Sequence, residues 1–232
     1  GSSTLIPEAG WHKAEELENV VIAGGAESTV LAVDQEGILY VAGENRGYAP
    51  GGQWLPTFTP VYGLGTVIDL QVTNQRAVIL NTKGELHAVD LSENGTRDRE
   101  ETSIRGLSWQ KLLSGVKQFS ANGNSLIYVS ADGRLVADNA GVKVPDDWYK
   151  AEDDGSRSLQ LGDVKEAAVS GDALLLLDRE GNLRLAKGGE AFTLELGKAV
   201  SHIYSTGSMF VMELEEGGYE VYDGESEELL AR

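Results

Sequence analysis

Cysteine is absent from this chain, and histidine occurs only three times, at His12, His87 and His202. Without cysteine there can be no disulfide framework, no thiolate zinc site and no cysteine nucleophile. Three histidines far apart in the sequence give no metal-binding motif either. We therefore expect no bound metal and no cofactor. The 232 residues suffice to bury roughly 70–75% of the surface of the unfolded chain, so a folded core needs no such staple.

Basic residues are scarce, because 19 Lys and Arg stand against 37 Asp and Glu, for a formal net charge of −18. A surface of this sign repels phosphate backbones, so we expect no nucleic-acid partner. The acidity has two interpretations, solubility or an acidic face that meets a basic partner. Long apolar runs are also missing: Ala173–Leu177 is far shorter than the ~20 residues of a membrane helix, so we expect no membrane insertion. We expect no signal peptide and assign no localisation.

The sequence does contain a repeat, in which a valine is followed 17 residues later by a glycine in five separate segments. The valines are Val20, Val67, Val116, Val164 and Val200, and the glycines are Gly37, Gly84, Gly133, Gly181 and Gly217. The five units cover about residues 20–66, 67–115, 116–163, 164–199 and 200–232. Self-similarity of this length is typical of solenoids and propellers.

Within each unit the apolar residues alternate with a period of two, which predicts β-strands. In the first unit we expect strands near Val20–Ala23, Thr29–Val33 and Ile38–Val41, with Gly37 in the tight turn before the third. Asp34 and Asp178 are expected to cap such turns through their side chains. Fourth strands are expected near Thr57–Tyr62, Ser103–Leu113, Ser158–Leu161 and Ala191–Leu196.

The fifth unit shows no fourth strand after Tyr222, because its tail from Gly224 to Arg232 is acidic and polar. The N-terminal segment, residues 4–19, supplies a candidate, since Trp11–Leu17 precedes Val20 much as Trp109–Leu113 precedes Val116. We therefore predict a single all-β domain over residues 1–232. It is a five-bladed β-propeller of four-stranded antiparallel blades, and the N-terminal strand closes the last blade.

The first unit, from Val20-Val21-Ile22-Ala23-Gly24-Gly25 to Ala42-Gly43-Glu44-Asn45, resembles the repeat of the regulator of chromosome condensation family. Asn45 stands where that repeat has its asparagine, and Ala42-Gly43 replaces the family's Trp-Gly pair. The resemblance implies a β-propeller and carries over no catalytic residue. The chain departs from the family in having five units rather than seven and no histidine in the second strands. Five units of this length also resemble tachylectin-type lectin propellers, without their Asn-Trp signature.

Binding residues are expected in the long loops that join the third and fourth strands of the first three units. The first loop, Glu44–Pro56, carries Arg46, Tyr48 and Trp54, residue types that dominate protein-binding surfaces. Trp54 could equally fold back onto its own blade. The loop Leu91–Thr102 contains a glycosylation sequon at Asn94.

The third loop, Asp138–Arg157, holds Trp148 and Tyr149 beside Asp146, Asp147, Asp153 and Asp154. These carboxylates lack the spacing of a calcium loop, which favours a solvated acidic loop. No motif ties a Ser/His/Asp set or a carboxylate pair together for catalysis.

The leading hypothesis is a non-enzymatic protein-interaction module that binds a partner through the face of the long loops, with Arg46, Tyr48, Trp54, Trp148 and Tyr149 as contact residues. The partner could belong to a larger assembly. One alternative is a carbohydrate-binding propeller, although its aromatics should recur equally in every unit. Another is a lyase or glycosidase with a site at the central channel, for which fold analogy alone says little.

Overall fold

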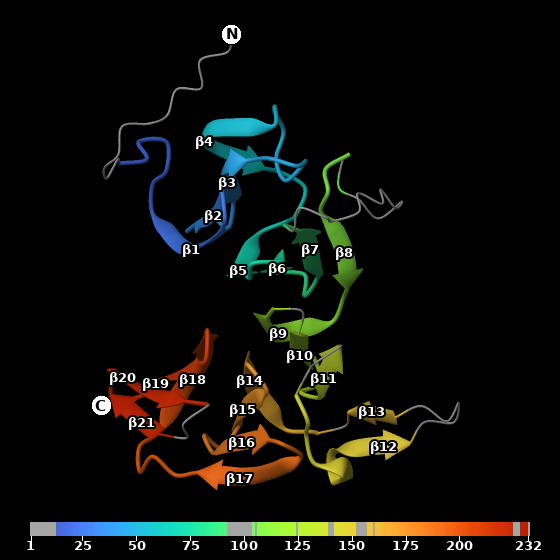
Figure 1. Cartoon of the computed structure of the whole chain (residues 1–232), viewed down its shortest axis with the longest axis vertical. Coiled ribbons are helices and arrows are strands. Elements are labelled where there is room, and N and C mark those ends of the chain that lie inside the picture. Colours follow the sequence, from blue (N-terminus) through green and yellow to red (C-terminus); the bar gives the residue numbers. More distant parts are fainter. Residues whose placement is uncertain are drawn as a thin grey trace.

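The computed structural model describes residues 13–91, 104, 106–123, 125–138, 142–151, 157–159, 161–224 and 228–231. The fold is all-β, and antiparallel sheets follow one another along the chain (Figure 1). Sheet 1 contains β1 (Val20–Ala26), β2 (Thr29–Asp34), β3 (Leu39–Glu44) and β4 (Trp54–Val61). Sheet 2 contains β5 (Val67–Val72), β6 (Arg76–Asn81), β7 (Leu86–Asp90) and β8 (Gln110–Leu113). Sheet 3 contains β9 (Val116–Asn122), β10 (Ser125–Ser130) and β11 (Leu135–Asp138).

A short 3-10 helix (Asp146–Trp148) leads into a small hairpin of β12 (Tyr149–Ala151) and β13 (Arg157–Leu159). Sheet 4 contains β14 (Val164–Ser170), β15 (Ala173–Asp178), β16 (Leu183–Lys187) and β17 (Glu190–Leu194). Sheet 5 contains β18 (Val200–Thr206), β19 (Met209–Leu214), β20 (Tyr219–Asp223) and β21 (Glu228–Ala231). No helix in the described part is long and apolar enough to cross a membrane.

The spacing of 17 within each unit follows from the strand register, because each repeated valine pairs with the residue three positions before the turn glycine of its own unit, as Val20 does with Asp34. In the first three units the turn glycine also contacts the valine of the next unit. The Val67 N–H donates to the Gly37 carbonyl at 2.9 Å, and Val116 and Val164 bond Gly84 and Gly133 in the same way at 3.0 and 3.1 Å. Gly37 has a φ of +79°, and a Cβ there would lie 2.8 Å from the Val67 carbonyl oxygen. The turn at Gly37 therefore requires glycine both for its backbone conformation and for the close approach of the next sheet.

The predicted capping of the turns by aspartate is confirmed. Asp34 Oδ1 accepts hydrogen bonds from the N–H groups of Glu36 at 3.0 Å and Ile38 at 2.9 Å. Asp178 does the same for Glu180 and Asn182, at 2.9 Å each. These bonds fix the hairpin turns that set the register of the second and third strands.

Consecutive sheets pack face to face. We call the face of a sheet that is directed toward the next sheet in chain order its forward face, and the opposite face its backward face. In the second strand of each sheet, the forward face carries the residues that stand six and four positions before the turn glycine. Leu31 and Val33 of sheet 1 therefore share a core cluster with Ala77 and Ile79 of sheet 2. The same pairing joins sheet 2 to 3, sheet 3 to 4 and sheet 4 to 5.

The five sheets form an arc, with sheet 1 at one end and sheet 5 at the other (Figure 1). In the described part of the chain, no hydrophobic cluster joins sheet 1 to sheet 5. The closed five-bladed ring stays a prediction.

Two predictions about fourth strands need correction. Sheet 5 has its own fourth strand, β21, which pairs with β20, so the tail after Tyr222 does supply a strand. The fourth position is thereby occupied by the chain's own C-terminal segment rather than by the N-terminal one. Of the predicted N-terminal strand, residues 4–12 lie outside the described residues, and residues 13–19 contain one turn and no strand.

In sheet 3 the segment predicted as the fourth strand is mostly diverted. β13 pairs with β12 in the separate hairpin, and only an isolated bridge between Leu135 and Leu161 links it to β11. The hairpin lies beside β11 and outside the sheet proper (Figure 1).

Candidate functional site

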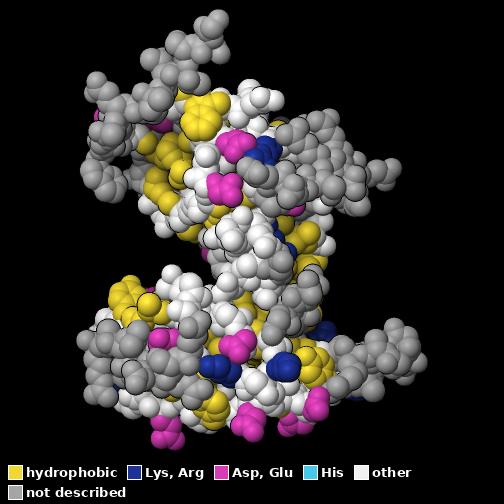
Figure 2. Space-filling model, viewed as in Figure 1, with side chains coloured by type: hydrophobic (Ala, Val, Ile, Leu, Met, Phe, Trp, Pro, Cys, Tyr) yellow, Lys and Arg dark blue, Asp and Glu magenta, His cyan; other side chains and the backbone are white. Residues whose placement is uncertain are grey.

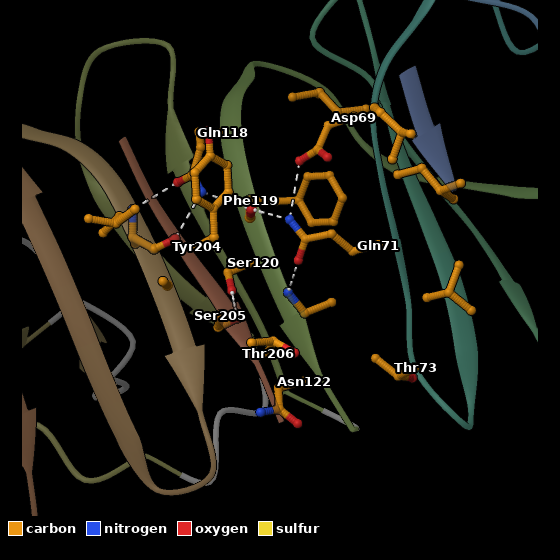
Figure 3. A pocket seen from close by; sticks show the side chains of 18 of the residues that line it. Asp69, Gln71, Thr73, Gln118, Phe119, Ser120, Asn122, Tyr204, Ser205 and Thr206 are labelled. Atoms are coloured by element: carbon orange, nitrogen blue, oxygen red, sulfur yellow. Dashed lines mark hydrogen bonds between the residues drawn. The ribbon is translucent and has the colours of Figure 1, made fainter. Parts of the chain in front are cut away.

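The first strands of the sheets surround a cleft of about 1150 Å³ (Figure 3). Its walls come from β1, β5, β9, β14 and β18. The turns after three of these strands reach its rim, at Asn74, Gly123 and Gly207. Because first strands line the central channel of a propeller, this cleft is the candidate functional site.

Two glutamines on the cleft wall link neighbouring sheets. Gln71 of sheet 2 donates through Nε2 to the Phe119 carbonyl at 2.9 Å, and its Oε1 accepts from the Ala121 N–H at 2.8 Å (Figure 3). Gln118 of sheet 3 makes the same pair of bonds to the N–H and carbonyl of Ala167, at 2.9 and 2.8 Å. At these positions the backbones of the two separate sheets do not hydrogen-bond each other, so the two glutamine amides supply partners for backbone groups of the next sheet.

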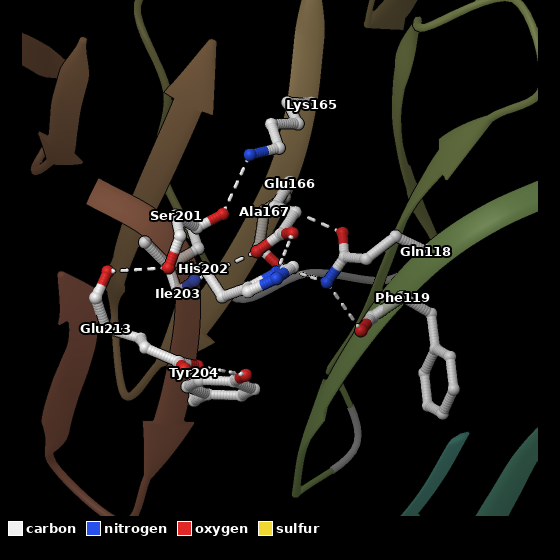
Figure 4. A network of polar contacts seen from close by, with 10 residues as sticks. All are labelled: Gln118, Phe119, Lys165, Glu166, Ala167, Ser201, His202, Ile203, Tyr204 and Glu213. Carbon is white, nitrogen blue, oxygen red and sulfur yellow. Dashed lines mark hydrogen bonds and ion pairs between the residues drawn. The ribbon is translucent and has the colours of Figure 1, made fainter. Parts of the chain in front are cut away.

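A carboxylate makes the corresponding link from sheet 4 to sheet 5 (Figure 4). Glu166 Oε2 accepts from the Ile203 N–H at 2.9 Å, and Oε1 lies 2.6 Å from His202 Nδ1. Beside it, Lys165 Nζ donates to the Ser201 carbonyl at 2.7 Å. The polar side chains of the cleft wall are therefore largely occupied in holding the arc together.

Two other ionisable groups on the wall have altered acidity. Burial raises the pKa of Asp69, against the lowering effect of the hydrogen bond from Gln71 at 3.1 Å. Burial and the hydrogen bond from its hydroxyl to Glu213, at 3.0 Å, raise the pKa of Tyr204 to about 12. Tyr204 therefore stays a neutral hydrogen-bond donor at physiological pH.

Apolar side chains on the cleft wall face solvent. Val21, Ile68 and Tyr204 are 61%, 52% and 48% exposed, although each lies within a strand. Exposed apolar groups that cluster in a concave surface indicate contact with another molecule.

The structure separates the five predicted contact residues into two groups. Arg46, Tyr48 and Trp54 belong to sheet 1 and its loop, whereas Trp148 and Tyr149 lie beside sheets 3 and 4. Tyr48 is only 2% exposed, and its carbonyl accepts a hydrogen bond from Trp109 Nε1 at 2.7 Å. Trp54 begins β4, opposite Glu44, and is 59% exposed.

The remaining predicted residues have local partners. Arg46 pairs with Glu44 at 2.9 Å. Trp148 is buried, with the Arg184 guanidinium 5.7 Å from its ring centre, and Tyr149 is partly exposed at the start of β12. Among the five predicted contact residues, Trp54 is thus the aromatic residue whose side chain is mostly exposed.

Asn45 holds the first loop in shape. Its Oδ1 accepts from the N–H groups of Tyr48 and Ala49 at 2.8 and 3.0 Å, and its Nδ2 donates to the carbonyls of Ala49 and Gly52 at 2.9 Å each. These four bonds require an amide side chain, which both donates and accepts, at this position of the loop.

The other sequence predictions concern loops that are only partly described. The sequon at Asn94 and the pair Asp153-Asp154 lie outside the described residues. Within the described residues no group of three or more His, Cys, Asp or Glu side chains could hold a metal ion.

No protein-family model matches the chain, and no curated protein matches its sequence. Solved structures do match its fold. Human WBSCR16 is 18% identical, with a TM-score of 0.59, over 88% of this chain and 61% of that one. Yeast RCC1 (Prp20), in complex with Kap60, is 16% identical with a TM-score of 0.60, over 88% of this chain and 56% of that one. Prp20p from Saccharomyces cerevisiae matches similarly, at 16% identity and a TM-score of 0.58, over 88% and 57%.

The chain therefore spans 56–61% of the length of these neighbours. At this level of identity the likeness shows the fold alone. The chain has an RCC1-like β-propeller fold.

Proposed function

We propose that this protein is a non-enzymatic protein-interaction module that holds a partner polypeptide at its central cleft. The observation that carries the proposal is the exposure of Val21, Ile68 and Tyr204 within strands that line a cleft of about 1150 Å³. Apolar side chains in such a place lose their unfavourable hydration when a partner covers them.

The predicted long-loop face supports the same proposal. In sheets 1 and 2 the end of the third strand is hydrogen-bonded to the turn after the first strand, from the Glu44 N–H to the Ser28 carbonyl at 2.9 Å and from the Leu91 N–H to the Gln75 carbonyl at 2.7 Å. The long loops of these two sheets therefore leave from the same end of the sheets as the turns that rim the cleft. A partner in the cleft can extend onto this end, where Trp54 and Arg46 lie.

The solved neighbours are consistent with protein binding as a use of this fold. One Prp20 structure contains Kap60, and another describes its binding to Gsp1p and histones. For the present chain these names supply no partner identity, and they support only the class of function.

A carbohydrate-binding propeller is less well supported. The residues four after the repeated valines are Gly24, Gln71, Ser120, Ala168 and Tyr204, so the cleft repeats no aromatic residue. Equivalent sugar sites in each unit would require one.

A second candidate function is acid–base catalysis in the cleft. It is favoured by the Glu166–His202 contact of 2.6 Å and by the raised pKa of Asp69 on the opposite wall. Against it, Glu166 is also held by the Ile203 N–H, in the structural link already described. If His202→Ala abolished turnover of a glycoside or polyuronide panel, catalysis would replace protein binding.

The test of the proposed function compares two substitutions in the same sheet. Ile68→Glu places a charge in the cleft, whereas Leu112→Glu places one on the outer strand β8, at a residue of similar exposure. In a crosslinking pull-down from the native source, we expect Ile68→Glu to lose partners that the wild type and Leu112→Glu retain. Equal recovery with all three proteins would contradict a cleft-binding role. Trp54→Ala tests whether the contact extends to the loop end.

A further inference from the structure

In the described part of the chain, no further sheet packs against the forward face of sheet 5. Nine positions of β18, β19 and β20 share this face by strand pairing: His202, Tyr204, Thr206, Met209, Val211, Glu213, Tyr219, Val221 and Asp223. All nine are exposed or partly exposed. On the opposite face of the same strands, Phe210, Met212 and Tyr222 are buried against sheet 4.

Much of this forward face is apolar. Tyr219 and Met209 are 57% and 38% exposed, and Val211 and Val221 lie between them. Figure 2 shows hydrophobic side chains beside a deep notch that separates the two ends of the arc. A sheet face of this composition is normally covered in a folded assembly.

One position on the face differs from its equivalents in the other sheets. Four residues before the turn glycine, sheets 1 to 4 have Val33, Leu80, Val129 and Leu177, all buried against the next sheet. Sheet 5 has Glu213 there, and Tyr204 donates a hydrogen bond to its carboxylate at 3.0 Å. Covering a carboxylate with an apolar surface alone would cost desolvation energy without compensation. A partner that covers Glu213 therefore needs a group that pairs with it.

The charge of the face indicates the sign of that group. The nine positions contain two carboxylates, Glu213 and Asp223, and no Lys or Arg. A second copy of this chain is a poor occupant, because the net charge of −18 repels it. The backward face of sheet 1 is no better suited, since its central positions Val30 and Ala32 offer no base.

We propose that the forward face of sheet 5 docks a strand-forming polypeptide of another protein, with an apolar side that covers Met209, Val211 and Tyr219 and a Lys or Arg that pairs with Glu213. The inference rests on the proposed function, of which it names the partner chemistry. The basic side chain satisfies the carboxylate, and the apolar side continues the forward packing that sheets 1 to 4 already show.

The experiment is a selection from a displayed library of cyclised β-hairpins, each of about 14 residues with one apolar side. The central position of that side is randomised. The protein is used as wild type, Glu213→Lys, Glu213→Gln and Glu190→Lys. Glu190→Lys is the matched control, because it makes the same change of net charge at an exposed position of β17.

We expect the wild type and Glu190→Lys to enrich Lys and Arg at the randomised position by about tenfold. Glu213→Lys should enrich Asp and Glu instead, and Glu213→Gln should show no charge preference. Circular dichroism melts establish that each variant is folded. The uncharged Glu213→Gln keeps the test available should the charge reversal not fold.

Three outcomes would overturn the proposal. They are the same charge preference for Glu213→Lys as for the wild type, no enriched hairpin, or a self-association of the wild type that Glu213→Lys abolishes. The last would identify a second copy as the occupant. Failure of the proposed function is a separate result, because it is read from the cleft variant Ile68→Glu.

Discussion

Sheets 4 and 5 are built on the same pattern but differ in what covers them. The second strand of sheet 4, β15, reads Ala-Leu-Leu-Leu-Leu-Asp, and its five apolar residues are all buried because sheets 3 and 5 cover its two faces. The second strand of sheet 5, β19, reads Met-Phe-Val-Met-Glu-Leu, and its residues alternate between exposed or partly exposed and buried. A continuous apolar strand thus marks a sheet between two others, and an alternating one marks a sheet at the end of the arc.

The largest expected effect concerns equivalent forward-facing residues of these two sheets. Leu175→Ala removes a fully buried side chain from the cluster between sheets 4 and 5, and should lower the free energy of unfolding by about 2–5 kcal/mol. Val211→Ala, at the equivalent place in sheet 5, should cost about 1 kcal/mol or less, because that side chain is already partly hydrated. Urea unfolding measures both. Equal losses of unfolding free energy in the two variants would contradict the claim that the forward face is covered in sheet 4 and uncovered in sheet 5.

The next effect concerns the links between sheets. Gln118→Ala leaves the N–H and carbonyl of Ala167 without their side-chain partners, which should lower the free energy of unfolding by about 1–3 kcal/mol. Gln35→Ala, at an exposed turn residue, is the control and should change it by less than about 0.5 kcal/mol. If the two variants were equally stable in urea, Gln118 would not be a link.

Sheet 2 also lies between two others, and it encloses a histidine. Burial lowers the pKa of His87 from its ordinary value of 6.5, and Nε2 lies 3.6 Å from Glu85 Oε2, too far for a hydrogen bond. Because the fold favours neutral His87, the unfolded chain takes up the proton first as pH falls. The stability that this preference contributes is complete above pH 6.5 and is lost progressively below it.

Glu85 responds at lower pH. Hydrogen bonds from Lys111 and Asn81 hold its pKa at about 2, so its contribution is present above pH 4.5 and disappears as pH falls through about 2. His87→Leu should therefore remove the pH dependence of stability just below 6.5 and retain that below 4.5. Melting temperatures measured from pH 7 to pH 3 separate the two. An unchanged slope just below pH 6.5 in His87→Leu would exclude the histidine as its source.

The smallest effect is expected for Glu213→Leu, which gives sheet 5 the kind of residue that sheets 1 to 4 have at this position. With no sheet in front of it, the leucine gains little burial, and the free energy of unfolding should change by about 0.5 kcal/mol or less. A gain of several kcal/mol would mean that the face is already covered. Thermal melts at two protein concentrations also detect association through the new apolar patch.

The sequence predicted those features that depend on contacts repeated in each unit. The spacing of 17 between Val67 and Gly84 recurs in every unit because each repeated valine pairs with the residue three positions before its own turn glycine, as Val67 does with Asn81. By contrast, β21 was missed because Glu228–Ala231 is a short strand without alternation. In the sequence it is separated from its partner β20 by the acidic segment 224–227.

The site was harder to predict than the fold. Gln71, Gln118 and Glu166 stand in first strands that also contain other polar residues, and the sequence does not tell which of these polar side chains bond the backbone of the next sheet. Tyr48 and Trp54 stand six residues apart in one loop, yet Asn45 turns the first into the core and the strand β4 leaves the second exposed. Such choices depend on the path of the loop, which composition does not determine.

The most direct test of this account uses the two methionines of the chain, which both lie on β19 but on opposite faces. Met209 is 38% exposed on the forward face, and Met212 is fully buried against sheet 4. Hydroxyl-radical footprinting with mass spectrometry compares their oxidation within one strand of one protein. We expect rapid oxidation of Met209 and protection of Met212, with Met209 becoming protected when a partner is bound. Equal protection of both methionines in the isolated protein would show that another surface already covers sheet 5, and would contradict the account.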